Sequence, residues 1–103
     1  MDQTQAIQKV KQFAEVVRHY LPVCDVLLYG SYAKGRPRRY SDIDVAIVVD
    51  EYAGDILGMK ARLFHLRSHI DVRIEPLLLE RKHDPAHFLT EIARTGKLVA
   101  SYA

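Results

Sequence analysis

The segment Ile43–Val49 constrains the fold of this chain more than any other part of its sequence. It is aliphatic apart from Asp44. A near-continuous apolar run of this length is typical of a strand that is covered on both faces. Two acids, Asp42 and Asp44, lie where the run begins. The sequence therefore predicts a buried strand with a pair of carboxylates at its entrance.

Hydrophobic periodicity predicts the elements on either side of this strand. Apolar positions at helical spacing predict three helices, over residues 4–21, 55–68 and 84–95. Short apolar or alternating runs predict two more strands, over residues 23–29 and 70–79, with one helical turn in the loop after the first and an extended tail after Gly96. Pro76 lacks a backbone N–H, so the strand over 70–79 should lie at a sheet edge or bend there. We expect a single α/β (α+β) domain over residues 1–103, a small mixed sheet of about three to four strands with helices mainly on one face.

Composition excludes several classes of protein. The 103 residues are 49% hydrophobic and 27% charged, as in an ordinary globular domain. No apolar run approaches the roughly 20 residues that cross a bilayer, and the N-terminus does not resemble a secretory signal, so we expect a cytoplasmic protein. A single cysteine excludes an internal disulfide and a Cys-rich metal site. The net charge of +2 is too small to indicate a nucleic-acid-binding face.

Asp42 and Asp44 have the spacing of a metal site. Side chains two apart on a strand point to the same face, with Cα atoms about 6.6 Å apart. Two ionised carboxylates this close repel each other unless a cation lies between them. Mg²⁺ prefers oxygen ligands and leaves positions for water and phosphate, and two Mg²⁺ ions about 3.5–4 Å apart would fit here. Together with the Gly-Ser turn that precedes it in the sequence, the pair predicts metal-assisted phosphoryl chemistry.

The strand predicted over 70–79 offers a third carboxylate. If it lies beside Ile43–Val49, the two backbones are about 4.8 Å apart, and Asp71 comes within reach of the aspartate pair. Glu75 has the same parity and is the rival for this position. A solvent-facing row of Asp71, Arg73 and Glu75 is the alternative without function.

A Gly-Ser turn precedes the acids and suits a phosphate group. Gly30 lets the backbone approach an anion closely, and the Ser31 hydroxyl can donate a hydrogen bond to it. The basic loop that follows, which contains Lys34, Arg36, Arg38 and Arg39, could hold a triphosphate, contact RNA or simply stay solvated. Arg39 and Lys34 are its candidates for phosphate contacts.

Together these segments resemble the DNA polymerase beta-like nucleotidyltransferase superfamily, and the short chain resembles its minimal nucleotidyltransferase (MNT) branch. The matching motifs are Gly-Ser at residues 30–31, Ser-Asp-Ile-Asp at 41–44 and Ile-Asp-Val-Arg at 70–73. Members transfer a nucleoside monophosphate from a nucleoside triphosphate to a hydroxyl group and release pyrophosphate. The resemblance implies that Asp42 and Asp44 hold two Mg²⁺ ions and that Gly30 and Ser31 hold the β- and γ-phosphates. It favours Asp71 over Glu75 as the third carboxylate, which activates the acceptor.

The resemblance also implies a partner. Larger relatives carry a second domain for the acceptor, and we expect this chain to obtain that site from a partner subunit or from a second copy of itself. In the minimal branch the partner is an all-helical HEPN-type toxin, the nucleotidyltransferase is its antitoxin, and the implied reaction is transfer of AMP from ATP to a tyrosine hydroxyl. A non-catalytic module that neutralises its partner sterically and a small-molecule nucleotidyltransferase are the alternatives. Nucleic acid is not expected as a direct substrate.

Overall fold

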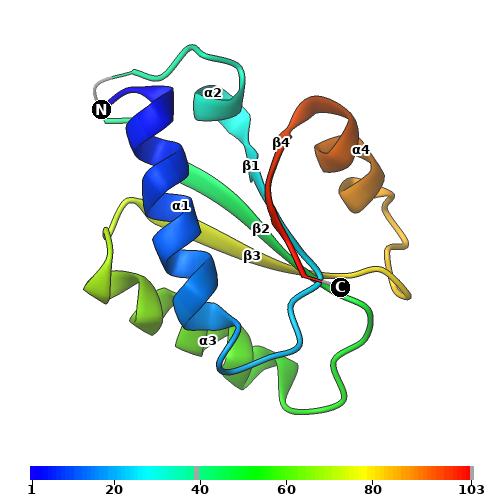
Figure 1. Ribbon diagram of the computed structural model, residues 1–103. Coiled ribbons are helices and arrows are strands. Elements are labelled where there is room, and N and C mark those ends of the chain that lie inside the picture. The colour runs from blue at the N-terminus through cyan, green and yellow to red at the C-terminus, as the bar shows by residue number, and fades with distance from the viewer. Residues whose placement is uncertain (39, 103) are drawn as a thin grey trace.

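Four strands form a single mixed sheet at the centre of the protein (Figure 1). The computed structural model describes residues 1–38 and 40–102. Along the chain the strands are β1 (Asp25–Tyr29), β2 (Ile43–Val49), β3 (Ile74–Glu80) and β4 (Lys97–Ser101). They are arranged in the order β3-β2-β1-β4, with β2 parallel to β3, and β1 antiparallel to both β2 and β4. The predicted small mixed sheet is confirmed.

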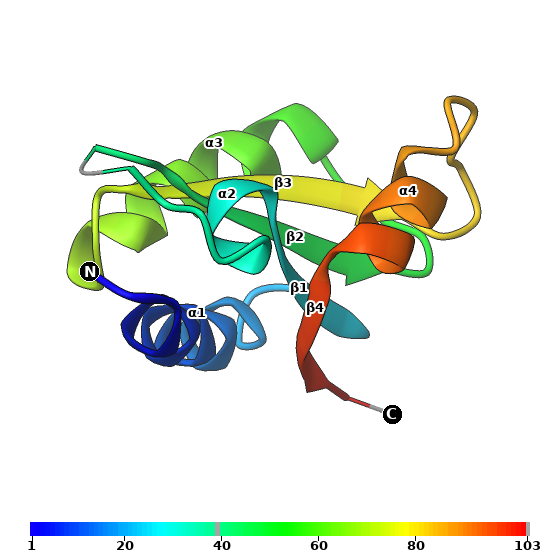
Figure 2. The same cartoon turned by 90° about the horizontal axis from the view of Figure 1, so that it is seen from above.

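The helices cover the two faces of the sheet unequally. They are α1 (Gln3–Val17), α2 (Gly30–Ala33), α3 (Ile56–Leu66), the short 3-10 turn η1 (Arg67–His69) and α4 (Phe88–Thr95). Helices α1 and α3 pack over one face, whereas α4 packs over the other and lies well apart from α1 in both views (Figures 1 and 2). The predicted placement of helices mainly on one face is confirmed. Within the described residues, none of these helices has the length and apolarity needed to cross a bilayer.

Strand β2 is buried on both faces because its side chains enter two separate cores. Its odd-numbered residues belong to the larger core beneath α1 and α3. Ala46 and Val48 point the other way and belong to the smaller core beneath α4. The continuous apolar run is thus explained, and Asp44 is the one half-buried position at its entrance.

Helix α1 ends at Val17, earlier than the predicted boundary near residue 21. The backbone N–H of Tyr20 bonds to the oxygen of Val17, three residues back, so the chain tightens into a turn ahead of Pro22. Leu21 is nevertheless buried in the main core. Periodicity therefore identified a core residue correctly but extended the helix too far.

Strand β3 begins at Ile74, four residues later than the predicted start at residue 70. The Asp71 carboxylate accepts a hydrogen bond from the backbone N–H of Arg73 at 2.9 Å, and the backbone N–H of Ile74 donates to the backbone carbonyl oxygen of Asp71 at 3.1 Å. These bonds form a turn of the kind that aspartate favours. Pro76 then lies in an edge strand, as predicted.

Helix α4 begins at Phe88 rather than directly after Asp84. The Asp84 carboxylate accepts hydrogen bonds from the backbone N–H groups of Phe88 and Leu89, at 3.0 and 3.1 Å. It therefore caps the helix from a short distance upstream. Gly96 ends the helix, as predicted, and the tail after it becomes strand β4.

Candidate active site

Three polar residues form a row across the sheet where β2 begins. Tyr29 of β1 lies opposite Asp44 of β2, and Asp44 lies opposite Glu75 of β3. Adjacent strands are about 4.8 Å apart, so the row places the three residues within side-chain reach of one another. The row lies on the face that α4 only partly covers, two residues along β2 from Ala46 of the smaller core.

Gly30 approaches Asp44 so closely that no side chain would fit between them. Its φ of +73° lies in the region that favours glycine, and a Cβ at this position would be 2.2 Å from Asp44 Oδ2. The Gly-Ser turn is thus required by a carboxylate of the site itself. Contact of this turn with a phosphate stays a prediction.

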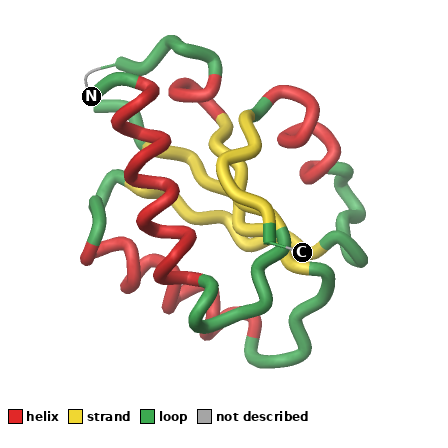
Figure 3. Tube along the Cα trace, in the orientation of Figure 1, coloured by secondary structure: helices red, strands yellow, loops and turns green. Residues whose placement is uncertain are grey.

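The aspartate pair opens on a pocket of about 490 Å³. Its lining residues are Ser31, Arg38, Tyr40, Ser41, Asp42 and Asp44. Four of them come from the loop between α2 and β2 or its end, which Figure 3 draws as a long connection between these two elements. The loop is closed by Ser41, whose hydroxyl accepts from the Arg38 backbone N–H at 2.7 Å and whose own N–H donates to the Arg38 oxygen at 3.0 Å. Carboxylates, hydroxyls and a guanidinium together suit a cation and a phosphorylated ligand.

A second pocket, of about 340 Å³, shares Asp44 with the first. Its lining includes Tyr29, Asp44, Lys60, Phe64, Glu75 and Leu77. Aromatic and aliphatic groups form most of its wall, and its polar lining residues are Asp44, Glu75, Lys60 and Tyr29. Asp44 lines both pockets, so a ligand in one would meet a ligand in the other at this carboxylate.

Negative charge accumulates along the row. Burial, and then the charges of Asp42 and Glu75, raise the pKa of Asp44 above its ordinary value. Burial, with Asp44 and Glu75, raises the pKa of Tyr29 to about 12, so this phenol is protonated at neutral pH. A divalent cation would relieve the repulsion between the carboxylates, and the donor set of Asp42 and Asp44 fits Mg²⁺.

Glu75 is held by an arginine. Arg67 Nη1 lies 3.2 Å from Glu75 Oε1 and also donates to the Ile74 oxygen at 2.7 Å. Across residues 1–38 and 40–102, no three His, Cys, Asp or Glu side chains are gathered into a metal centre. The site therefore contains an aspartate pair and, next to it, a third carboxylate engaged in an ion pair.

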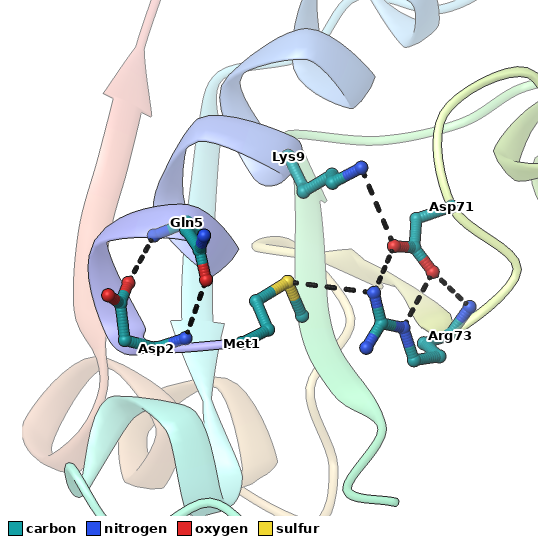
Figure 4. Close-up of polar contacts among 6 residues, drawn as sticks. All are labelled: Met1, Asp2, Gln5, Lys9, Asp71 and Arg73. Carbon is teal, nitrogen blue, oxygen red and sulfur yellow. Dashed lines mark hydrogen bonds and ion pairs between the residues drawn. The ribbon is translucent and has the colours of Figure 1, made fainter. Parts of the chain in front are cut away.

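Asp71 does not join this site, and its predicted position on the strand is wrong. Its carboxylate accepts hydrogen bonds from Arg73 Nη2 at 2.7 Å and Nε at 3.0 Å, and it forms an ion pair with Lys9 Nζ at 3.7 Å (Figure 4). The hydrogen bond from the Arg73 side chain lowers the pKa of Asp71 to about 2. The residue lines neither pocket and instead connects α1 to the turn before β3. Glu75, the rival, lies in the position that was expected of Asp71.

The two basic residues predicted to contact phosphate are Lys34 and Arg39. Lys34 is the C-cap of α2 and lines neither pocket, and its charge helps to lower the pKa of Glu91 on α4, behind the larger effect of Arg94. Arg39 lies outside the described residues. Of the basic residues that the structure describes in this loop, Arg38 lines the first pocket.

Several lining residues have no strong signal in the sequence. Lys60 and Phe64 reach the second pocket only because α3 packs beside β3, which no local pattern specifies. Tyr29 directly precedes the Gly-Ser turn, and this position could have identified it.

Comparison with known structures shows the same fold in proteins of low sequence identity. A protein from Sulfolobus solfataricus with a provisional nucleotidyltransferase assignment superposes with a TM-score of 0.63 at 19% identity, over 93% of this chain and 80% of that one. A toxin–antitoxin complex solved with AMP-PNP gives 0.61 at 19% identity, over 93% and 73% of the two chains. A variant of the toxin–antitoxin complex MntA–HpeT gives 0.61 at 17% identity, over 89% and 73%.

Sequence comparison identifies the family. No curated protein matches the chain. The family model described as "Polymerase beta, Nucleotidyltransferase", however, matches residues 11–103, which include both pockets and the entire sheet. The chain therefore belongs to the polymerase beta nucleotidyltransferase family.

Proposed function

We propose that this protein transfers AMP from ATP to a hydroxyl group of a protein partner, and that the partner is a helical toxin of the HEPN type for which it acts as antitoxin. The observation that carries the proposal is that Asp44 lines two pockets of different chemistry. One pocket suits a metal-bound triphosphate. The other suits an apolar group that ends in a hydroxyl.

The nucleotide would occupy the first pocket. Arg38 and the Ser31 hydroxyl would bind phosphate oxygens, because a guanidinium and a hydroxyl both donate to them. Arg38 thus takes the role predicted for Lys34, while Arg39 and Gly30 stay predicted phosphate neighbours. AMP-PNP, an ATP analogue, accompanies one structure of the same fold, which supports ATP as the donor.

The carboxylates of Asp42 and Asp44 would hold Mg²⁺, with two ions expected. Bound Mg²⁺ supplies positive charge that orients the triphosphate and makes an acceptor hydroxyl more acidic. The two side chains fit this role because Asp42 is exposed, Asp44 is half-buried, and the charge of Asp42 helps to raise the pKa of Asp44.

The acceptor would enter the second pocket with its hydroxyl toward Asp44 and Glu75. Its oxygen forms a bond to the α-phosphorus, the bond from that phosphorus to the bridging oxygen breaks, and pyrophosphate leaves with the electron pair. The proton of the hydroxyl passes to Glu75, which we propose as the third carboxylate in place of Asp71. A tyrosine fits this pocket because Phe64 and Leu77 provide an apolar wall for its ring.

A toxin as the partner is supported by the fold comparison, since two of the similar structures are toxin–antitoxin complexes. A sterically acting, non-catalytic antitoxin is the second candidate. The ion pair of Glu75 with Arg67 favours it, because a third carboxylate that stays on an arginine could not serve a reaction.

The decisive experiment uses ATP labelled at the α-phosphate, Mg²⁺ and the product of the neighbouring gene. We expect label on the partner, and loss of transfer in Asp42→Asn, Asp44→Asn and Glu75→Gln. If no label is transferred and the variants behave like the wild type, the catalytic proposal fails. If a triple variant of these three acids still neutralises the partner, the steric candidate is correct.

A further inference from the structure

We infer that Arg67 is a positioning residue which holds Glu75 away from the aspartate pair and competes with the divalent cation for this carboxylate. The inference rests on the proposed function, since it concerns the third carboxylate of the same site. It predicts that cation binding has to break the contact between Arg67 and Glu75.

Arg67 is anchored independently of Glu75. Its Nη1 donates to the Ile74 oxygen at 2.7 Å, which is shorter than its 3.2 Å contact with Glu75. Its guanidinium also lies over the Phe64 ring, 4.8 Å from the centroid. The side chain is 24% exposed. A backbone hydrogen bond and a cation–π contact therefore keep the positive charge in place even when Glu75 leaves.

Glu75 is the partner that can move. Its side chain is 40% exposed, and a single oxygen contacts the arginine. Its backbone is already paired with that of Asp44 in the β2–β3 ladder. Rotation about its side-chain bonds would therefore bring the carboxylate toward Asp44 with no change in the strand.

Two charges compete for one carboxylate in this arrangement. With Glu75 on Arg67, the described acids do not form a three-membered metal centre. With Glu75 turned toward Asp44, its carboxylate would give the cation a third set of oxygens beside those of Asp42 and Asp44. Since a partly exposed ion pair is weak, its loss should tighten cation binding only about two- to fivefold, equivalent to about 0.4–1 kcal/mol.

The test is a Mn²⁺ titration of the whole chain, with free Mn²⁺ followed by its electron paramagnetic resonance signal. The variants are Arg67→Gln, Arg67→Lys and the matched control Arg62→Gln. Arg62 lies on the neighbouring helix α3 with its guanidinium over the Tyr20 ring, so its substitution removes the same charge without touching Glu75. Each variant is also made in a Glu75→Gln background.

We expect Arg67→Gln to bind Mn²⁺ about two- to fivefold more tightly than the wild type, while Arg62→Gln and the charge-preserving Arg67→Lys stay close to it. The gain should vanish when Glu75 is glutamine. Equal or weaker binding by Arg67→Gln with an unchanged circular dichroism spectrum would overturn the inference, as would a gain that persists without Glu75. If the wild type binds no Mn²⁺ through Asp44, as judged by Asp44→Asn, the proposed metal site fails as well. If only the Arg67 variants deviate from expectation, the proposed function stands.

Discussion

Replacing Gly30 by alanine should disable the site by displacing Asp44. Gly30 and Gly35 both have positive φ, at +73° and +69°. Alanine in this region is disfavoured by about 1–2 kcal/mol at either position. Only at Gly30 does the new Cβ meet another group, Asp44 Oδ2 at 2.2 Å, whereas a Cβ at Gly35 has no atom within 4 Å. Gly35→Ala therefore reproduces the backbone effect without the collision.

The expected loss of rate in Gly30→Ala follows from the distance between the new Cβ and Asp44 Oδ2. Ordinary contact with a Cβ begins near 3.4 Å, so the Asp44 carboxylate has to move by more than about 1 Å. A displacement of this size at a reacting group reduces the rate about 100-fold, or about 2.7 kcal/mol of transition-state stabilisation. Both variants should also lose about 4–8 °C in Tm for each kcal/mol of backbone strain.

The assay measures kcat/KM for transfer of labelled AMP at a temperature where both variants are folded. We expect Gly30→Ala to lose about two orders of magnitude and Gly35→Ala to stay within a few-fold of the wild type. Mn²⁺ binding by Gly30→Ala should weaken in parallel. Equal activity of the two variants at matched folded fractions would refute the reasoning that Asp44 depends on the absence of a Cβ at Gly30.

Three further predictions concern the acids and the basic loop. Glu75→Gln should abolish transfer, whereas Asp71→Asn should retain it and instead lower thermal stability; the reverse pattern in paired activity and unfolding assays would restore Asp71 as the third carboxylate. The folded-state pKa of Asp71 is lowered from 3.8 to about 2, so its stabilising contribution is present above about pH 4 and is lost as pH falls toward 2. The free energies of unfolding in urea of wild type and Asp71→Asn should therefore differ at pH 5 and converge near pH 2. A difference that stays constant with pH would contradict this. In initial-rate measurements, Arg38→Gln should raise the KM for ATP about tenfold or more, as expected for a lost charge-assisted hydrogen bond. Lys34→Gln removes the same charge from the same loop and should leave the KM unchanged.

The elements that depend on local pattern were predictable. Strand β2 has the predicted bounds, because burial on both faces leaves a continuous aliphatic run that few other structures tolerate. The alternation of Ile70, Val72 and Ile74 was misleading. Val72 is 66% exposed, and the hydrogen bond from Arg73 to Asp71 turns the chain where the pattern indicated a strand.

The strand pattern alone leaves two candidates for the carboxylate beside Asp44, and the family resemblance favoured Asp71, whereas the sheet pairs Asp44 with Glu75. Asp71 and Glu75 have the same parity, so alternation alone cannot separate them. The choice depends on the register between β2 and β3, in which Asp44 pairs with Glu75. That register is fixed by tertiary contacts and by the turn before β3, neither of which is visible as a periodicity. The role of α3 in the second pocket is hidden for the same reason.

The outer edge of β3 limits how a partner can approach the site. The backbone N–H and C=O groups of successive strand residues point to opposite sides of the strand. The Arg73 oxygen accepts a hydrogen bond from the Ile43 N–H of β2, so the backbone groups of Ile74 and Pro76 point away from β2. Arg67 already occupies the Ile74 oxygen, and Pro76 has no N–H to donate. An incoming polypeptide therefore cannot extend the sheet by adding a strand at this point. Under the proposed function, an acceptor side chain would reach the second pocket from a helix or a loop whose own backbone hydrogen bonds are already satisfied.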